Sequence, residues 1–352
     1  MMDLFKGYKK SVSEFIQNFL RDKQNEFSRI NHWGPDALKR LGPSVTSGKM
    51  IRSGLVLLGY EMCKGKSLSS VFPAAAAVEF IQTALLIHDD IIDRDHYRRG
   101  LPSLFYQYAQ KGDKEGVTEP AHFGEGMGIC LGDISFFLAF ELLSKLKTSP
   151  SLKESIIRQW AQELCYVGLA QMQDLYFGEG RASISEKDIL QLYLYKTARY
   201  SFSLPLKTGA LLGGADSELL AGLDKCGQDF GLLFQLKDDE LGLHGSEKEL
   251  GKPVGSDLRE CKKTLHYYYL SQKAEAKDLK RFEDICGNEI LSLNMVQEVR
   301  NMMTKYRVDH IISQKMDSLS QELEKQITAL EIPKKHKHSL FKLLEFSMKR
   351  KK

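Results

Sequence analysis

Hydrophobic residues return every three or four positions along most of the chain, which places them on one face of an α-helix. In the segment 74–93, for example, Val78, Ile81, Leu85 and Ile92 keep to one side. The same spacing predicts further helices over about 4–30, 50–63, 126–146, 151–177, 185–209, 217–242, 258–273, 276–288, 292–330 and 337–349. No segment alternates polar and apolar residues between turn signals, as a strand does. The pattern predicts an all-α fold.

Two polar stretches interrupt these helices and are expected to be loops. The first is 111–126, and the second is 242–256, which contains four Gly and one Pro. Neither stretch has the length or composition of an interdomain linker. We therefore expect one all-α domain over residues 1–352.

Composition narrows the class of protein. The six cysteines lie far apart and form no Cys-x-x-Cys pair, which is typical of a reduced, cytoplasmic protein. The first residues are already charged and amphipathic, unlike a signal peptide. No apolar run approaches the roughly 18 residues of a membrane span. We expect a cytoplasmic protein without integral membrane association.

Charge is placed unevenly along the chain. Of the net charge of +4, the segment 334–352 alone contributes +7, with seven Lys and one Arg against one Glu. The rest of the chain is therefore close to neutral, which gives no case for nucleic acid as a partner. The basic tail needs its own explanation, either closure over an anionic ligand or attraction to a membrane surface.

The segment 86–102, LIHDDIIDRDHYRRGLP, carries the most chemical information. An apolar helix face ends there in Asp89, Asp90 and Asp93. Asp89 and Asp93 lie one helical turn apart on the same face, where like charges destabilise a bare helix. Carboxylate oxygens suit Mg²⁺, which is commonly shared with phosphate oxygens. A solvated acidic helix end is the alternative interpretation of this motif alone.

A second acidic group makes the metal hypothesis stronger. Asp238 and Asp239 end another apolar helix in FQLKDDELGL. Cationic residues that suit diphosphate oxygens occur at several other places in the chain. These are Lys49, Arg52, Arg98, Arg99, Lys252, Lys262 and Lys263. Two acidic groups and several cations predict two diphosphates in one cavity.

In these motifs the sequence resembles the all-trans polyprenyl diphosphate synthases, most of all their archaeal-type short-chain members. DDIIDRDHYRRG resembles the first aspartate-rich motif, and FQLKDDELGLHGSEKELGKPVGSDLRECKKTL the second. GKMIRSGL, QMQD and KTARY resemble three further family elements, and all five stand in the family's order. The resemblance implies a single helical bundle around a central cavity and a homodimer.

The resemblance also implies a role for each matching residue. Three Mg²⁺ ions and the allylic diphosphate would be held by Asp89, Asp90, Asp93, Asp238, Arg98, Lys196 and Lys252, with Lys262 as a further substrate-binding residue. Isopentenyl diphosphate would be held by Lys49, Arg52, Gln82 and Arg99. The developing allylic cation would face Thr197, Gln235, Gln171 and Tyr200. Asp174 would belong to the polar network on the metal side, and His88 would be a packing residue.

Three positions depart from the family pattern. Lys237, directly before Asp238, adds a cation beside the metal-binding aspartates. Ser53 stands where the family has a proline in GKxxRP. Gly242 stands where many members have a third aspartate, which suggests that one Mg²⁺ is held with less protein charge. Gly242→Asp is then expected to leave activity intact or to lower the Mg²⁺ requirement.

The favoured function is head-to-tail condensation of isopentenyl diphosphate with an allylic diphosphate. A terpene cyclase is less consistent, because Gly242 and Ser246 follow Asp238 where a cyclase carries its metal-binding triad. A non-catalytic prenyl-diphosphate-binding subunit is also less consistent, because such subunits lose an aspartate cluster and the first is intact here.

The residues four and five before the first aspartate form the chain-length floor in this family. Here they are Leu85 and Ala84, and neither is aromatic. One isoprene unit is about 5 Å long, close to one helical turn, so Ile81 is the next candidate floor. We expect geranylgeranyl diphosphate as the main product, with farnesyl and geranylfarnesyl or longer products as the alternatives.

Overall fold

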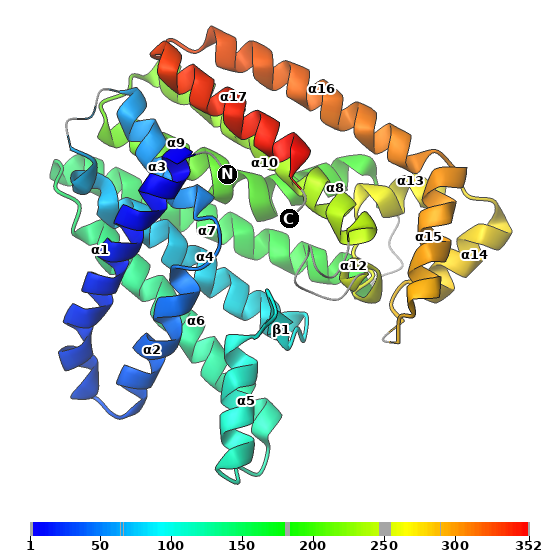
Figure 1. Cartoon of the computed structure of the whole chain (residues 1–352), viewed down its shortest axis with the longest axis horizontal. Helices are drawn as coiled ribbons and strands as arrows, with labels where there is room; N and C mark the ends of the chain where they lie inside the picture. Colours follow the sequence, from blue (N-terminus) through cyan, green and yellow to red (C-terminus); the bar gives the residue numbers. More distant parts are fainter. Residues whose placement is uncertain are drawn as a thin grey trace. The chain divides into compact units, whose positions relative to one another are not determined.

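A computed structural model describes residues 3–63, 65, 67–179, 184–245, 255–288 and 290–350 (Figure 1). Within these residues the chain is helical almost throughout, which confirms the predicted all-α class. The helices form two compact units. Unit 1 consists of Met1–Gln159 and Pro205–Asp216, and unit 2 of Trp160–Leu204 and Ser217–Lys352. Helix α7 (Pro150–Glu179) runs from the first into the second. The single-domain expectation stays a prediction.

Unit 1 is built around helix α4 (Phe72–Ile92). The other elements are α1 (Asp3–Ser28), α2 (Trp33–Val45), α3 (Ile51–Met62), η1 (Leu68–Val71), β1 (Tyr97–Arg98), β2 (Leu101–Pro102), α5 (Leu104–Lys114), α6 (Pro120–Ser144) and most of α9 (Leu204–Leu212). Helix α4 contacts α1, α2, α3 and α6. The run Ala74–Ala77 is fully buried, and its small side chains let neighbouring helices approach closely. A helix that is apolar on nearly every side belongs in a core.

Two stretches in unit 1 are long and apolar enough to cross a membrane. They are Leu68–Ile92 and Pro120–Ser144, and 67% and 44% respectively of an 18-residue apolar window in each is buried inside the protein. The expectation that no apolar run reaches that length is therefore wrong. A core helix meets the same criterion because it is covered by protein on most sides.

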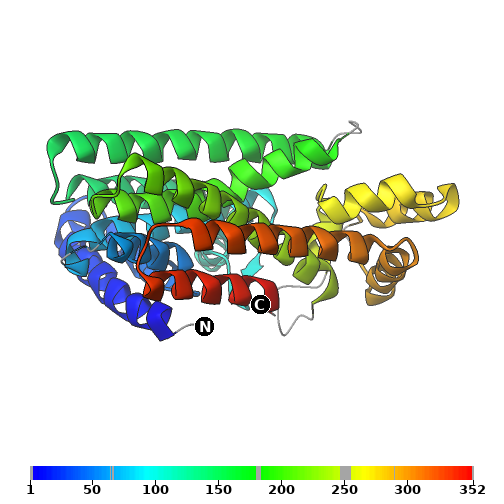
Figure 2. The same cartoon turned by 90° about the horizontal axis from the view of Figure 1, so that it is seen from above.

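Unit 2 is built around helix α10 (Ser217–His244). Its other elements are α8 (Glu186–Tyr193), the π-helix η2 (Leu194–Ser203), α12 (Ser256–Arg259), α13 (Leu265–Lys273), α14 (Ala276–Ile285), α15 (Leu293–Lys305), α16 (Val308–Ala329) and α17 (Lys334–Lys349). Helices α16 and α17, orange and red in Figures 1 and 2, both lie along α10. A Cβ at Gly231 would lie 2.2 Å from the Cα of Ala198. This glycine therefore allows η2 to approach α10.

The boundaries differ from the sequence expectation in several places. Helix α2 was not expected, because Gly34, Gly42 and Pro43 mask its apolar face. The expected loop 111–126 is shorter in the structure and covers residues 115–119, since α5 ends at Lys114 and α6 begins at Pro120. The expected helices 185–209, 258–273 and 292–330 are each divided, the last at Arg307, whose φ is +58°. Helix α10 continues to His244, and residues 246–254 lie outside the described part.

A buried polar network connects η2, α8 and α10. Thr197 Oγ1 donates to Gln235 Oε1 at 2.9 Å, and Gln235 Nε2 donates to Asp239 Oδ1 at 2.8 Å. The hydroxyl of Tyr193 donates to the other oxygen of Asp239 and accepts from the Leu265 N–H at 3.0 Å. Burial raises the pKa of Asp239 to about 8. The network orients the first residues of η2, where a π-helix often marks a functional site.

We predict that Asp239→Asn flattens the fall of stability with rising pH. The native pKa of Asp239 lies above the ordinary value of 3.8, so the folded state keeps a proton that the unfolded chain releases. Stability from this group is complete below about pH 4 and is lost as pH rises towards 8, by up to about 1.4 kcal/mol per unit. Urea unfolding of the metal-free protein between pH 5 and 8 measures the difference between wild type and variant. The matched change at exposed Asp284 should leave the wild-type slope unchanged, and equal slopes for wild type and Asp239→Asn would contradict the prediction.

Candidate active site

The carboxyl end of α4 gathers three carboxylates. The Asp93 N–H donates to the Asp89 carbonyl at 2.8 Å, which confirms that the two residues lie one helical turn apart. Both are partly exposed, whereas Asp90 is buried. The unpaired carbonyls of a helix end add further negative charge. This end of α4 therefore requires cations.

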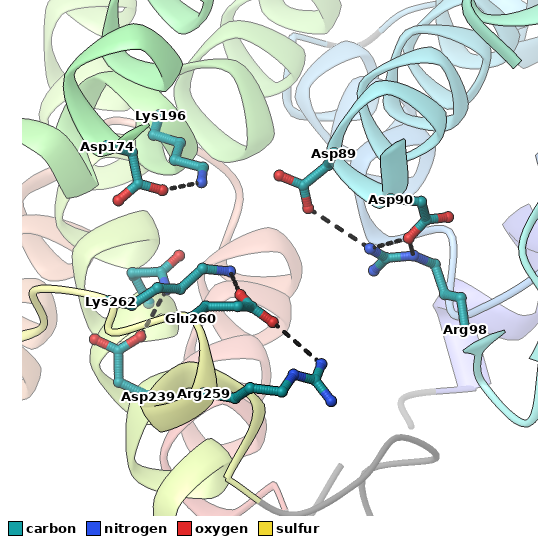
Figure 3. A network of polar contacts seen from close by, with 10 residues as sticks. Asp89, Asp90, Arg98, Asp174, Lys196, Asp239, Arg259, Glu260 and Lys262 are labelled. Atoms are coloured by element: carbon teal, nitrogen blue, oxygen red, sulfur yellow. Dashed lines mark hydrogen bonds and ion pairs between the residues drawn. The ribbon is translucent and has the colours of Figure 1, made fainter. Parts of the chain in front are cut away.

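Arg98 is the cation that the chain itself supplies (Figure 3). Its Nε and Nη2 lie 2.6 Å and 2.5 Å from Asp90 Oδ1, and Nη2 lies 3.6 Å from Asp89 Oδ2. Burial raises the pKa of Asp90 to about 6, although Arg98 opposes the shift. The sequence predicted Asp90 as a metal ligand and Arg98 as a diphosphate ligand. The structure pairs the two with each other, so the more accessible carboxylates are those of Asp89 and Asp93.

A short β-hairpin with a two-residue turn places Arg99 away from the acidic end of α4. Strands β1 and β2 pair Arg98 with Leu101, and the turn residues Arg99 and Gly100 have φ of +54° and +75°. Positive φ at both central positions is typical of a type I′ turn. Arg99 Nη1 donates to Ser47 Oγ at 2.7 Å. Sequence reasoning found no strand, because two residues are too few to show alternation.

Gly48 supports this position of Arg99 in two ways. Its φ is +70°, and a Cβ there would lie 2.7 Å from Arg99 Nη1. Burial and the nearby Arg98 and Arg52 lower the pKa of Arg99. Arg52 lies in the first turn of α3, directly after Lys49 and Met50. Like charges gathered at a helix N-terminus form a site for an anion, which agrees with the predicted roles of Lys49, Arg52 and Arg99.

The departure at Ser53 has a structural counterpart in Glu79. The Ser53 N–H donates to Glu79 Oε1 at 2.9 Å, and both residues are buried. A proline has no N–H to donate. Burial raises the pKa of Glu79, while the Ser53 N–H and Arg52 oppose the shift. Glu79 thus connects α4 to the start of α3, and Gln82 lies one turn further along α4.

Sequence reasoning did not find Glu79, although a signal was present. Glu79 is the one acidic residue in the apolar run 72–87. His88, in contrast, lies as predicted in a packing position. A Cβ at Gly132 of α6 would lie 2.2 Å from His88 Nε2.

In unit 2 the two aspartates of α10 differ in exposure. The Asp238 side chain is 58% exposed, and Arg350 Nη2 lies 2.8 Å from its Oδ1. The Arg350 side chain is only 4% exposed, donates to the Phe234 carbonyl at 2.9 Å and stacks over that ring at 3.7 Å. Asp238 is thus the accessible carboxylate of the two. The basic tail reaches it through Arg350, and Lys351 and Lys352 lie outside the described residues.

The predicted residues of η2 also have partners within unit 2. Lys196 forms an ion pair with Asp174 of α7 (Figure 3), so the i, i+3 pairing of Asp174 with Gln171 is not its main contact. Thr197 and Gln235 are hydrogen-bonded, as described above, and Tyr200 is buried. Lys262 Nζ lies 2.6 Å from Glu260 Oε2. Lys252 lies outside the described residues.

The structure changes the interpretation of Gly242. A Cβ at this position would lie 2.5 Å from Asp257 Oδ2. The carboxylate of Asp257 therefore already occupies the space beside residue 242. The glycine provides room for that carboxylate, and the expectation that Gly242→Asp leaves activity intact stays a prediction. Sequence reasoning could not find this contact, because 15 residues separate the two positions.

The accessible carboxylates of Asp89, Asp93 and Asp238 are hard oxygen donors, and this donor set fits Mg²⁺. Substrate phosphates and water commonly complete the coordination of Mg²⁺. The residues present therefore fit the predicted metal.

Comparison with known proteins gives the same interpretation. The profile of the polyprenyl synthetase family matches residues 37–303. The chain is 32% identical to a short chain isoprenyl diphosphate synthase of Methanothermobacter thermautotrophicus, over 82% of this chain and 80% of that one. It is 31% identical to a geranylgeranyl diphosphate synthase of Sulfolobus acidocaldarius, over 87% and 88%. Other relatives are named farnesyl and geranylfarnesyl diphosphate synthases.

The fold matches as well. A crystal structure of a geranylgeranyl pyrophosphate synthase from Corynebacterium glutamicum, complexed with isoprenyl diphosphate and magnesium, is similar with a TM-score of 0.92. That protein is 28% identical, and the match covers 99% of this chain and 100% of the other. The chain belongs to the polyprenyl synthetase family and is a trans-prenyltransferase of the short-chain isoprenyl diphosphate synthase type.

Proposed function

We propose that this prenyltransferase condenses isopentenyl diphosphate with allylic diphosphates to make geranylgeranyl diphosphate, with Mg²⁺ as its metal. The main observation behind the proposal is that two consecutive arginines, Arg98 and Arg99, contact different groups of residues. Arg98 pairs with the acidic end of α4, whereas Arg99 joins the cationic group beside Gly48 and Arg52. One hairpin thus serves a metal-type site and an anion-type site, as two diphosphate substrates require.

The chain's own residues have separate tasks in this reaction. Asp89 and Asp93 of unit 1, and separately Asp238 of unit 2, would hold Mg²⁺, which when bound would stabilise the departing allylic diphosphate. Lys49, Arg52 and Arg99 hold and orient the second diphosphate. Thr197 donates its proton to Gln235, so its oxygen lone pairs remain for a developing carbocation. A fixed dipole of this kind stabilises charge without reorganisation during the reaction.

A terpene cyclase is the weaker proposal. It has one diphosphate to bind and needs no second cationic group such as the one around Arg99. Asp257 beside Gly242 also departs from the cyclase triad, because it lies 15 positions further along the chain. Incubation with Mg²⁺, radiolabelled isopentenyl diphosphate and each allylic primer distinguishes elongation from cyclisation and from binding without turnover.

We also propose that the protein acts in the cytoplasm as a homodimer. Helix α6 exposes Phe137 and Ile129, and the second half of α7 exposes Leu169, Met172 and Tyr176. Phe137 is 72% exposed. Apolar faces of this kind are typical of surfaces that a second copy covers. Solution mass tests the dimer.

The product assignment depends on α4. Ala84 and Ile81 are buried, Leu85 is partly buried, and none of them is aromatic. Positions 84 and 85 therefore present little bulk one turn before Asp89, which supports elongation beyond fifteen carbons.

We predict that Asp89→Ala and Asp93→Ala each lower turnover by about 10²–10³-fold without loss of stability. Each change removes stabilisation of the leaving diphosphate in the transition state, while it relieves repulsion at the helix end. Steady-state kinetics and thermal melting measure the two effects. Asp113→Ala, at an exposed aspartate of α5, is the matched control and should resemble wild type. Turnover near the wild-type rate in both Asp89→Ala and Asp93→Ala would reject the metal assignment.

We predict that deletion of residues 349–352 raises the KM for isopentenyl diphosphate about tenfold, equal to about 1.4 kcal/mol. Arg350→Ala should reproduce the effect, because this buried side chain connects the tail to Asp238. Lys349 pairs with Glu345 in its own helix, so Lys349→Ala should not. Unchanged kinetics together with lost binding to anionic vesicles would instead assign the tail to a membrane surface.

We predict that Ala84→Phe shifts the main product from geranylgeranyl to farnesyl diphosphate. An aromatic ring there fills about the length of one isoprene unit. Mass analysis of the dephosphorylated products measures the shift, and Leu85→Phe offers a second variant at a less tightly packed position. Ala77→Phe, two turns further from Asp89 and equally buried, should keep the twenty-carbon product. Farnesol as the main wild-type product, or no shortening in either variant, would contradict the assignment.

A further inference from the structure

Two cysteines from separate segments of unit 2 lie against each other. Cys261 follows α12, and Cys286 is the first residue after α14. The carbonyl of Leu258 accepts from the Cys261 N–H at 3.1 Å and from the Gly287 N–H at 2.9 Å. This shared acceptor holds the two segments together. A Cβ at Gly287, the residue directly after Cys286, would lie 3.8 Å from the Cβ of Cys261.

A buried lysine completes the group. Lys263 Nζ lies 3.1 Å from Cys261 Sγ and 4.0 Å from the ring centroid of Tyr267. The Lys263 residue is 8% exposed. A buried ammonium is costly without an anionic partner, and a thiolate at Cys261 would supply one. The charged and titratable groups that act on Cys261 are Cys286, Lys263 and, with the opposite sign, Glu283.

We propose that Cys261 and Cys286 form a redox modification site, in which a hydroperoxide oxidises Cys261 and Cys286 then closes an intramolecular disulfide. In the first step the Cys261 thiolate attacks the peroxide, the O–O bond breaks, and a sulfenic acid and hydroxide form. In the second step the Cys286 sulfur attacks the sulfenic sulfur, the S–O bond breaks, and water leaves. Together two thiols and one hydrogen peroxide become one disulfide and two waters.

The environment favours Cys261 over the other described cysteines. The Cys286 hydrogen bond and Lys263 lower the pKa of Cys261 to about 6, against the effect of burial. Burial raises the pKa of Cys226 to about 12 and also raises that of Cys63. Cys130 and Cys165 are the more exposed thiols. Access alone therefore predicts reaction at Cys130 and Cys165, whereas thiolate chemistry predicts reaction at Cys261.

The disulfide would also restrain residues that are assigned to substrate binding. Cys286 lines a small pocket together with Asp257, Lys262 and Asp239. A covalent bond between the two cysteines would fix the turn that carries Lys262. This consequence rests on the proposed function, whereas formation of the disulfide does not.

The test is peptide mapping of the full-length reduced protein after brief exposure to equimolar hydrogen peroxide at pH 7. We expect a 261–286 disulfide before any change at Cys130 or Cys165, and its reversal by dithiothreitol. Cys286→Ser, or Cys286→Ala if the serine variant melts early, should stop the reaction at a sulfenic acid that dimedone traps on Cys261. Lys263→Met should slow the oxidation about tenfold at pH 7, because it lowers the thiolate fraction. First oxidation at Cys130 or Cys165, or an unchanged rate in Lys263→Met, would overturn the proposal.

Turnover of the oxidised enzyme tests the link to Lys262 separately. We expect a reversible loss of turnover in wild type that Cys286→Ser does not show. A 261–286 disulfide with full turnover would reject the link to the substrate, and the mapping result would still decide the modification site. A protein without prenyltransferase activity in any state would reject the proposed function alone.

Discussion

Concentrated negative charge at the end of α4 is the constraint that organises unit 1. Asp89, Asp90 and Asp93 stand at the negative end of the helix dipole, and a bare cluster of this kind opposes folding. Arg98 balances the buried member of the group through two short contacts. The hairpin that brings Arg98 there also sends Arg99 to Gly48. The ion pair between Arg98 and Asp90 thereby also helps to position Arg99 beside Gly48.

The same constraint recurs in unit 2, with other partners. Asp238 is paired with Arg350, and Lys196 is paired with Asp174. These predicted ligands of a metal or a diphosphate are thus held by counter-charges from the chain. Such pairs contribute little when exposed to water. The Lys196–Asp174 pair is instead largely buried, with side chains that are 23% and 13% exposed. The Arg350 side chain is almost fully buried as well.

Two of the departures from the family pattern have compensating contacts. At position 53 a serine N–H replaces the proline ring, and the buried carboxylate of Glu79 accepts from it. At position 242 a glycine replaces an aspartate, and Asp257 from a later segment reaches the same place. In each case a residue distant in sequence provides what the local change removed. A position-by-position comparison with the family motif shows only a mismatch. The contacts in the structure show which other residue takes over the missing interaction.

The sequence by itself determined the all-α class, most helix positions and the residue types of the site. Helix periodicity is local, and the acidic and basic motifs are contiguous, so neither needs knowledge of the fold. Tertiary structure decided which of these residues meet. The pairings of Asp90 with Arg98 and of Asp238 with Arg350 join residues 8 and 112 positions apart. The hairpin at 97–102 and the π-helical form of η2 were also not predicted from the sequence pattern. Contacts of this kind depend on how helices pack, and packing is set by the summed shape of many side chains rather than by the period of any one segment.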